Sequence, residues 1–347
     1  MDGLIGYTLA KNYADGVCEE IKSSKKLVIP DGTTVVTAAM VPDRDIEYVE
    51  LPGSVARIDD EAFMNCRRLK FIHRGKRKLG DPLYIEIGES AFCNCVSLAV
   101  FLEDNGTNEI EINFENVETT AFKNCISLIS CFKLHGDIGD SAFANCRSLS
   151  ICRIESVNSI GNIAFENCVN LNSVVLMNCY GVEIGSGVFE GCYNLKSISL
   201  ASGYFESIGD YSFCGCQSLE QIDLSEVESI GALAFIGTGL KYLVFPDSVD
   251  SIDGQTGLNG NGLISHSINL VDIVILGTPT MTINNMWPNV NSGLRIFVLE
   301  SNFSFFTSDP VWSIFYQMGL IVKIEDHLDY LLHTKGIDLY RWGYSGQ

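Results

Sequence analysis

Residues 138–154 read IGDSAFANCRSLSICRI, and the spacing of residue types in this stretch recurs before and after it over most of the chain. The repeated unit is Ile-Gly-x-x-Ala-Phe-x-x-Cys-x-x-Leu-x-x-Ile-x-Leu, in which Ile stands for any apolar residue. Eight copies are present, with their phenylalanines at Phe63, Phe92, Phe122, Phe143, Phe165, Phe189, Phe213 and Phe235. The first two steps, of 29 and 30 residues, indicate loop insertions in the early copies, because the later steps are 21 to 24 residues.

Two further positions of the unit are filled almost as regularly. The cysteine position holds Cys66, Cys95, Cys125, Cys146, Cys168, Cys192 and Cys216, and only the eighth copy has Thr238 instead. A leucine follows three residues after each of these cysteines. One repeat of this size cannot bury its own apolar face, so the repeats must stack, and equivalent positions then form ladders through a continuous core.

The two halves of the unit predict different local structures. Leu-x-x-Ile-x-Leu alternates with a period of two, which is typical of a short strand. Gly-x-x-Ala-Phe is too short for a regular helix and predicts a turn or a single helical turn. We therefore expect an α/β-type repeat solenoid, a right-handed coil with short parallel strands on one face and turns or single helical turns on the other.

The unit resembles the repeat of the BspA-like leucine-rich repeat family, which occurs in bacterial surface proteins and in protist proteins. The resemblance covers residues 46–324, and the steps of 21 to 24 residues agree with the leucine-rich repeat period. It implies a leucine-rich-repeat-like coil. For function it implies only protein binding or adhesion, because the family has no shared catalytic residues to transfer to this chain.

These patterns divide the chain into four segments. Residues 1–55 predict an N-terminal helix and capping repeats, and residues 56–277 hold the solenoid. Residues 278–324 leave the repeat, and a strand, a helix and a last strand there form the C-terminal cap that the resemblance implies. Residues 325–347 are an aromatic tail, which we expect to pack on the cap; docking of a partner by this tail is the alternative.

The composition limits the class of partner. The chain carries 43 acidic and 23 basic residues, for a formal net charge of -20. Such a chain would repel phosphate backbones and anionic membranes, whereas a basic protein partner would be steered towards it. Basic residues concentrate in Arg67–Lys78. They form either a targeting or anion-binding patch or, as we favour, a loop neutralised by acidic residues such as Glu103 in the next repeat.

The 13 cysteines predict thiols rather than a disulfide framework. Seven fill the inward position, and Cys131 and Cys152 fill apolar strand positions, so they serve as small hydrophobic residues. Stacked residues lie ~4.8 Å apart with parallel Cβ vectors, whereas a disulfide needs Cβ atoms ~3.8 Å apart that point towards each other. Free thiols favour a reducing compartment.

The ends of the chain and its hydropathy bear on location. The first residues, MDGLIGYTLAKNYADG, lack the charged and then apolar progression of a signal peptide, and no apolar run approaches a membrane span. We therefore expect a cytoplasmic protein. A cell-surface location is the alternative, which requires an upstream leader missing from this chain.

No motif in the sequence indicates catalysis. The five histidines are scattered, and no phosphate loop, HExxH motif or nucleophile elbow is present. The pairs Cys93/Cys95 and Cys214/Cys216 each include an inward cysteine and lie five repeats apart, so they do not predict a zinc site. We expect no enzyme, no cofactor and no metal; a solenoid with an acquired catalytic site is the remaining alternative, and no residues support it.

The exposed face of the strands is the predicted functional surface. Residues on each side of the central apolar residue of a strand point away from the core. In the first five repeats these positions give an apolar strip with one arginine: Phe71, Val100, Leu102, Phe132, Ile151, Arg153 and Val175. We predict a non-enzymatic interaction scaffold that binds a protein through this strip. The alternatives are an adhesin of the BspA-like type, or a face that merely tolerates apolar side chains.

Overall fold

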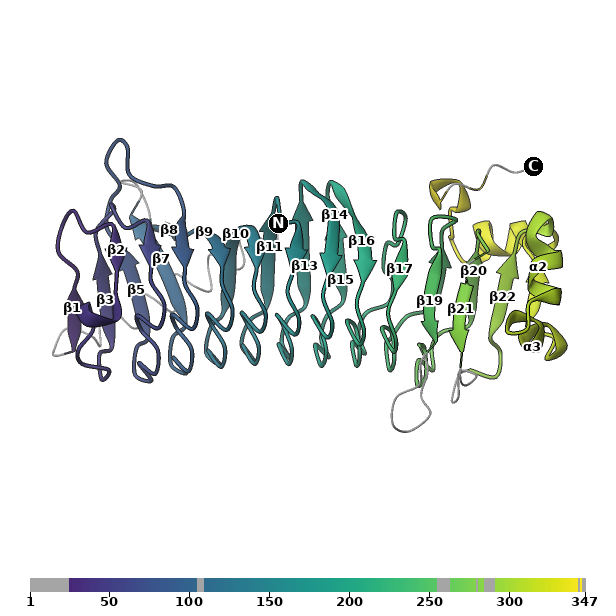
Figure 1. The fold of residues 1–347 in the computed structure, drawn as a ribbon, viewed down its shortest axis with the longest axis horizontal. Helices are drawn as coiled ribbons and strands as arrows, with labels where there is room; N and C mark the ends of the chain where they lie inside the picture. The colour runs from purple at the N-terminus through teal and green to yellow at the C-terminus, as the bar shows by residue number, and fades with distance from the viewer. Residues whose placement is uncertain are drawn as a thin grey trace.

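The computed structural model shows an elongated coil in which the chain winds around one long axis (Figure 1). The structure describes residues 25–104, 109–254, 263–278, 280–283, 291–342 and 344. The predicted N-terminal helix falls largely within residues 1–24, which lie outside this set. The fold is a parallel-strand β-solenoid of about 12 turns built from leucine-rich repeats. The predicted division into four segments stays a prediction.

The turns of the coil contribute strands to two ladders. The first ladder, from the Leu-x-x-Ile-x-Leu halves, contains β1 (Lys26–Val28), β3 (Tyr48–Leu51), β5 (Phe71–Arg74), β7 (Val100–Asp104), β10 (Ser130–Ile138), β11 (Ile151–Glu155), β13 (Ser173–Met177), β15 (Ser197–Leu200), β18 (Tyr242–Phe245), β20 (Asp272–Ile275), β22 (Arg295–Val298) and β23 (Ile321–Lys323). The second ladder contains β2 (Val35–Val36), β4 (Arg57–Ile58), β6 (Ile85–Ile87), β9 (Phe114–Val117), β12 (Ser159–Ile160), β14 (Cys179–Ile184), β16 (Gly203–Ile208), β17 (Ser229–Ile230), β19 (Ser251–Gly254) and β21 (Thr280–Ile283). The long strand β10 joins both ladders.

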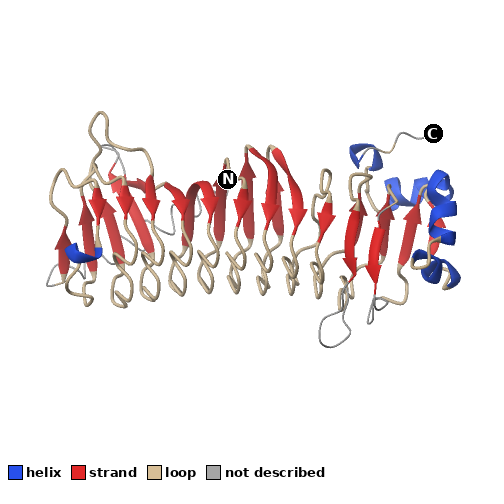
Figure 2. Cartoon of the chain, viewed as in Figure 1, coloured by secondary structure: helices blue, strands red, loops and turns tan. Residues whose placement is uncertain are grey.

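The second ladder corrects the prediction that strands occupy one face only. Its strands include the Ile of the Ile-Gly position. In strands such as β12 and β17 only this one residue points inward, so the sequence shows no alternation of apolar and polar residues that would predict a strand. The Gly-x-x-Ala-Phe-x-x-Cys segments form tight turns along a third side, seen in Figure 2 as a row of tan loops. Among the described strands all pairs are parallel except β7 with β8 (Glu109–Glu111). The first ladder is interrupted there, and again after β15, because residues 221–224 form no strand.

Two columns of side chains hold the turns together. The eight repeat phenylalanines stack as one continuous column, with neighbouring ring centroids 5.1–5.6 Å apart. In six successive repeats the cysteine Sγ donates a hydrogen bond, 3.1–3.2 Å long, to the carbonyl oxygen of the phenylalanine one repeat earlier. The residue before the cysteine is Asn or Gly because its φ is positive, as at Asn94 (+63°) and Gly191 (+71°).

The cysteine column therefore has a structural task. Each thiol supplies a second donor to a buried carbonyl that also accepts a backbone N–H three residues further along, as Phe165 O does from Cys168 N. In a ninth, degenerate copy Ser267 takes this position, and its hydroxyl donates to the Phe235 carbonyl over 2.9 Å. Burial raises the pKa of these thiols, to about 12 for Cys192. The column is thus chemically quiet at neutral pH.

Short helical elements close the C-terminal end of the coil. They are η2 (Glu300–Asn302), α2 (Phe303–Ser308), α3 (Trp312–Gln317), η3 (Glu325–His327), the π-helical turn η4 (Tyr330–Thr334) and η5 (Leu339–Trp342); η1 (Ala38–Met40) lies near the other end. Trp312 of α3 and Leu331, Leu339 and Tyr344 of the tail are buried. The Tyr330 ring of the tail stacks on the Phe297 ring of β22, with centroids 6.0 Å apart.

Candidate functional site

The outward positions of the first ladder form one long surface, which we call the strand face. On β11, β13 and β15 alternate residues point outward, and none of them is fully buried. Ile151 and Arg153 of β11 and Val175 of β13 are half-buried, next to the exposed Ser197 and Ser199 of β15. The parallel register places these residues in two straight columns. We call this part the central strand face.

The N-terminal part of the strand face is covered. Phe71, Val100 and Leu102 have exposed fractions of 1%, 0% and 0% and form a small apolar cluster separate from the main core. Tyr48 and Ile129 pack against this cluster, and the Tyr48 and Phe71 rings stack at 5.4 Å. The prediction that these three residues are exposed is therefore wrong. Strand alternation shows which way a side chain points but not whether another part of the molecule lies over it.

The position of Phe132 also differs from the prediction. The register of β10 and β11 shifts between Cys131, which pairs with Cys152, and Lys133, which pairs with Arg153. Phe132 is the extra residue of this bulge, so it does not stand beside Arg153 in the column as the repeat template requires. Its side chain lies outside the described residues. A bulge of one residue cannot be recognised from spacing alone.

Two cations consequently lie side by side on β10 and β11 but have different surroundings. Lys133 forms an ion pair with Glu155, and its hydrogen bond lowers the pKa of the Glu155 carboxyl below its usual value. Within the described part of the chain Arg153 has no ion-pair partner. A half-buried guanidinium without a partner, between Ile151 and Val175, presents charge and apolar area to the same ligand.

The C-terminal part of the strand face is sealed by the tail. Asp272 of β20 is completely buried, and its carboxylate contacts Arg295 Nη2 at 2.9 Å, Lys335 Nζ at 3.0 Å and the Tyr330 hydroxyl at 3.0 Å. The Arg295 guanidinium lies 4.1 Å from the centre of the Tyr330 ring. Lys335 and Tyr330 belong to the tail, so one carboxylate fastens the tail across the strand face at β20 and β22.

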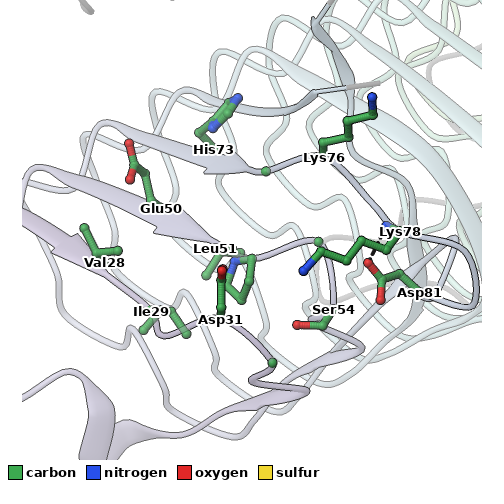
Figure 3. Close-up of a pocket in the computed structure, with 14 residues that line it drawn as sticks. Val28, Ile29, Asp31, Glu50, Leu51, Ser54, His73, Lys76, Lys78 and Asp81 are labelled. Carbon is green, nitrogen blue, oxygen red and sulfur yellow. Dashed lines mark hydrogen bonds between the residues drawn. The ribbon is translucent and has the colours of Figure 1, made fainter. Parts of the chain in front are cut away.

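A cavity lies near the N-terminal end of the coil (Figure 3). Its volume is about 620 Å³. It is lined by Val28, Ile29, Asp31, Gly32, Glu50, Leu51, Pro52, Gly53, Ser54, His73, Gly75, Lys76, Lys78 and Asp81. The sequence analysis missed this cavity. The turns Pro-Asp-Gly at residues 30–32 and Pro-Gly-Ser at 52–54, both of which line it, were the available signal.

The basic segment beside this cavity is partly neutralised, as we favoured. Arg74 is fully buried, and its guanidinium binds Glu103 at 3.0 Å and the carbonyl oxygens of Gly53 and Val55 at 2.8 and 2.7 Å. Arg77 also pairs with Glu103. These contacts fix the loop after β5 against the next repeat. They are structural, because a guanidinium engaged in this way is not available to a ligand.

Two searches of the described residues bear on chemistry and location. Within the described ranges no group of three or more His, Cys, Asp or Glu side chains is placed to hold a metal ion. In that same part of the chain no helix is both long and apolar enough to span a bilayer.

The strands, columns and turns define a leucine-rich repeat solenoid, and comparison of sequences identifies its family. The sequence model described as the BspA type leucine rich repeat region matches residues 33–135, 83–178 and 136–259, with six copies of the repeat. These matches span more than half of the chain. The protein belongs to the BspA-type leucine-rich repeat family, as the resemblance of the unit predicted. Proteins of this kind are typically non-enzymatic interaction scaffolds, and no catalytic family is indicated.

Several solved structures are similar to the chain. A leucine-rich repeat protein from Bacteroides ovatus is 21% identical with a TM-score of 0.45, over 72% of this chain and 70% of that one. The leucine-rich repeat protein of T. pallidum is 27% identical with a TM-score of 0.38, over 50% and 78%. A leucine-rich cell surface protein from Faecalibacterium prausnitzii is 18% identical with a TM-score of 0.32, over 73% and 88%. No curated protein matches the chain.

The comparisons give no support to the predicted cytoplasmic location.

Proposed function

We propose that this protein is a non-enzymatic scaffold that binds a protein partner through its central strand face. The supporting observation is that the strand face is covered at both ends and accessible over β11, β13 and β15. Of the seven residues predicted for the strip, the proposal keeps Ile151, Arg153 and Val175. The neighbouring serines of β13 and β15 are small, so a partner can approach the sheet closely there.

The side chains of the central strand face indicate which chemical groups the partner must have. Ile151 and Val175 offer apolar area, and Arg153 offers a guanidinium with no ion-pair partner among the described residues. A partner segment with apolar side chains and one carboxylate would match these groups. The net charge of -20 would still favour a partner that is basic as a whole, because the long-range field acts before contact.

The experiment is recovery of partners from cells by the intact protein, with matched variants. Ile151→Asp and Val175→Asp place charge on the central strand face, whereas Ser251→Asp places the same charge at an exposed position of β19. We expect the first two to lower recovery of a specific partner at least ~10-fold and the third to leave it unchanged. Equal recovery by all three, with unchanged thermal midpoints, would remove the proposal.

A second candidate is an adhesin of the BspA type, and membership of that family favours it. It would use the same surface, so the two candidates differ in location rather than in site. Labelling of intact cells with a membrane-impermeant reagent separates them. Labelled protein would establish the adhesin, and protein labelled only after lysis would establish the intracellular scaffold.

A further inference from the structure

We infer that Tyr180, Tyr204 and Glu206 form a second binding site, which takes a lysine or arginine side chain of a basic partner. The site lies on the second ladder, away from the central strand face. Tyr180 of β14 and Tyr204 of β16 are 62% and 36% exposed. Their rings meet edge to face, with centroids 6.3 Å apart and planes at 76°. Two exposed rings held together on neighbouring strands offer a small aromatic surface to a ligand.

The backbone is shaped around these three residues. Cys179 pairs with Gly203 and Val182 with Phe205, so β14 has an extra residue at Tyr180 or Gly181. Glu183 then pairs with Ser207, so β16 has an extra residue at Glu206. Bulges redirect side chains and concentrate at functional sites. Here the two bulges fall on the residues of the proposed site.

The groups converge over a glycine. Gly181 has a positive φ of +67°, and a Cβ placed on it would lie 3.1 Å from Glu206 Oε2 and 3.8 Å from the Tyr204 hydroxyl. The carboxylate and the phenol therefore lie directly above bare backbone. The Tyr180 ring lies beside the Tyr204 ring, next to the same group. The absence of a side chain at position 181 lets the Glu206 carboxylate lie close over the backbone, beside the Tyr204 hydroxyl.

The electrostatics select a cation. Residues 154–240 contain ten acidic residues and one basic residue, Lys196. Glu183, Glu206 and Glu228 are exposed, and none of them has an ion-pair partner in the part of the chain that the structure describes. An anionic ligand would be repelled, and an apolar one would desolvate the Glu206 carboxylate without compensation. A lysine or arginine gains both the carboxylate and the negative faces of the rings.

The test uses the intact protein and a pair of short peptides. One peptide carries a single lysine, and the other carries the neutral residue norleucine at the same position. Calorimetric titration should show binding of the cationic peptide and at least ~10-fold weaker binding of the neutral one. Tyr180→Ala and Tyr204→Ala should each weaken the cationic peptide ~3- to 10-fold, and Tyr204→Phe, which keeps the ring, should not.

Two controls make the result decisive. Tyr193→Ala removes another exposed tyrosine, on the turn side of the coil, and should leave binding unchanged. Ile151→Asp disables the central strand face and should also have no effect, so the two sites can fail independently. Equal binding of both peptides, no binding of either, or an equal loss in Tyr193→Ala would overturn the inference. A tyrosine-dependent oligosaccharide bound in preference to the cationic peptide would do the same.

Discussion

The outward positions of β13 and β20 belong to the same columns of the strand face, but their surroundings are opposite. Ser173 and Val175 of β13 remain accessible, whereas Asp272 and Val274 of β20 are completely buried. The inward residues of both strands are the same kind of apolar residue, so the coil itself does not cause the difference. The difference comes from the tail, which Asp272 fastens through Arg295, Tyr330 and Lys335. The inward residues therefore stabilise the coil, whereas the outward residues and the segments that cover them determine which part of the strand face is accessible to a partner.

The largest expected effect contrasts two adjacent residues of β13. Val174 is fully buried and Val175 is half-buried on the outer face. Val174→Asp would place an unpaired charge in the core and should cost more than about 4 kcal/mol of the free energy of unfolding. Val175→Asp should cost less than about 1 kcal/mol, because its charge faces water. Denaturant unfolding of the two variants measures the contrast, and similar losses would mean that β13 has no open face.

The next prediction breaks the closed end. Asp272→Ala removes the carboxylate that holds Arg295 and Lys335, and leaves both cations with reduced solvation and no partner. We expect a loss of about 1 to 3 kcal/mol, less than for a fully buried pair, because the Arg295 and Lys335 side chains are 35% and 29% exposed. Hydrogen exchange should rise over residues 325–344 and remain unchanged over β11 and β13. Glu220→Ala, which breaks the exposed pair with Lys241, is the control and should have no measurable effect.

Much of this architecture was predictable because it repeats. The Phe, Cys and Leu positions of every copy are inward and buried, as stacking of a 21- to 24-residue unit requires. The features that escaped prediction occur once. The coverage of Phe71 and Leu102, the bulge at Phe132 and the cavity between residues 30–32 and 75–81 depend on contacts specific to one turn. The candidate site was predictable as a face but not in its extent, because period-two spacing gives direction alone.

The third prediction concerns the cysteine column, which runs from the covered N-terminal part into the open part of the strand face and ends at Cys216, before Thr238 and Ser267. Burial raises the pKa of the Cys192 thiol from its ordinary value of 9.0 to about 12. A raised pKa contributes stability below the unfolded-state value, and this stability is lost as pH rises towards the folded-state value. The free energy of unfolding should thus fall between pH 9 and pH 12, by up to about 1.4 kcal/mol per pH unit for each buried thiol.

A substitution within the column tests this account. Cys192→Ser keeps a donor for the Phe165 carbonyl, as Ser267 does for Phe235, and removes one titrating thiol. Its unfolding free energy should fall less steeply than that of the natural protein above pH 9. Cys192→Ala should show the same shallower slope but a lower stability at pH 7, because the Phe165 carbonyl loses one of its two donors and keeps only the Cys168 N–H. Equal stability of the two variants at neutral pH would show that the sulfur hydrogen bond contributes nothing.

The smallest effect separates the two cations of the open region. Lys133→Met removes the partner of Glu155, so the pKa of that carboxyl should rise from its lowered value towards the ordinary one, which NMR titration measures. A lowered pKa contributes stability above the unfolded-state value, and this is lost as pH falls through the folded-state value. On acidification the free energy of unfolding should therefore fall more in the natural protein than in Lys133→Met. The difference between the two should be less than about 1 kcal/mol.

Arg153→Gln should leave the Glu155 titration unchanged and instead weaken partner recovery, because Arg153 is the cation without an ion-pair partner among the described residues. If Arg153→Gln shifts the Glu155 pKa as strongly as Lys133→Met, the two cations share one carboxylate, and the central strand face has no guanidinium to offer.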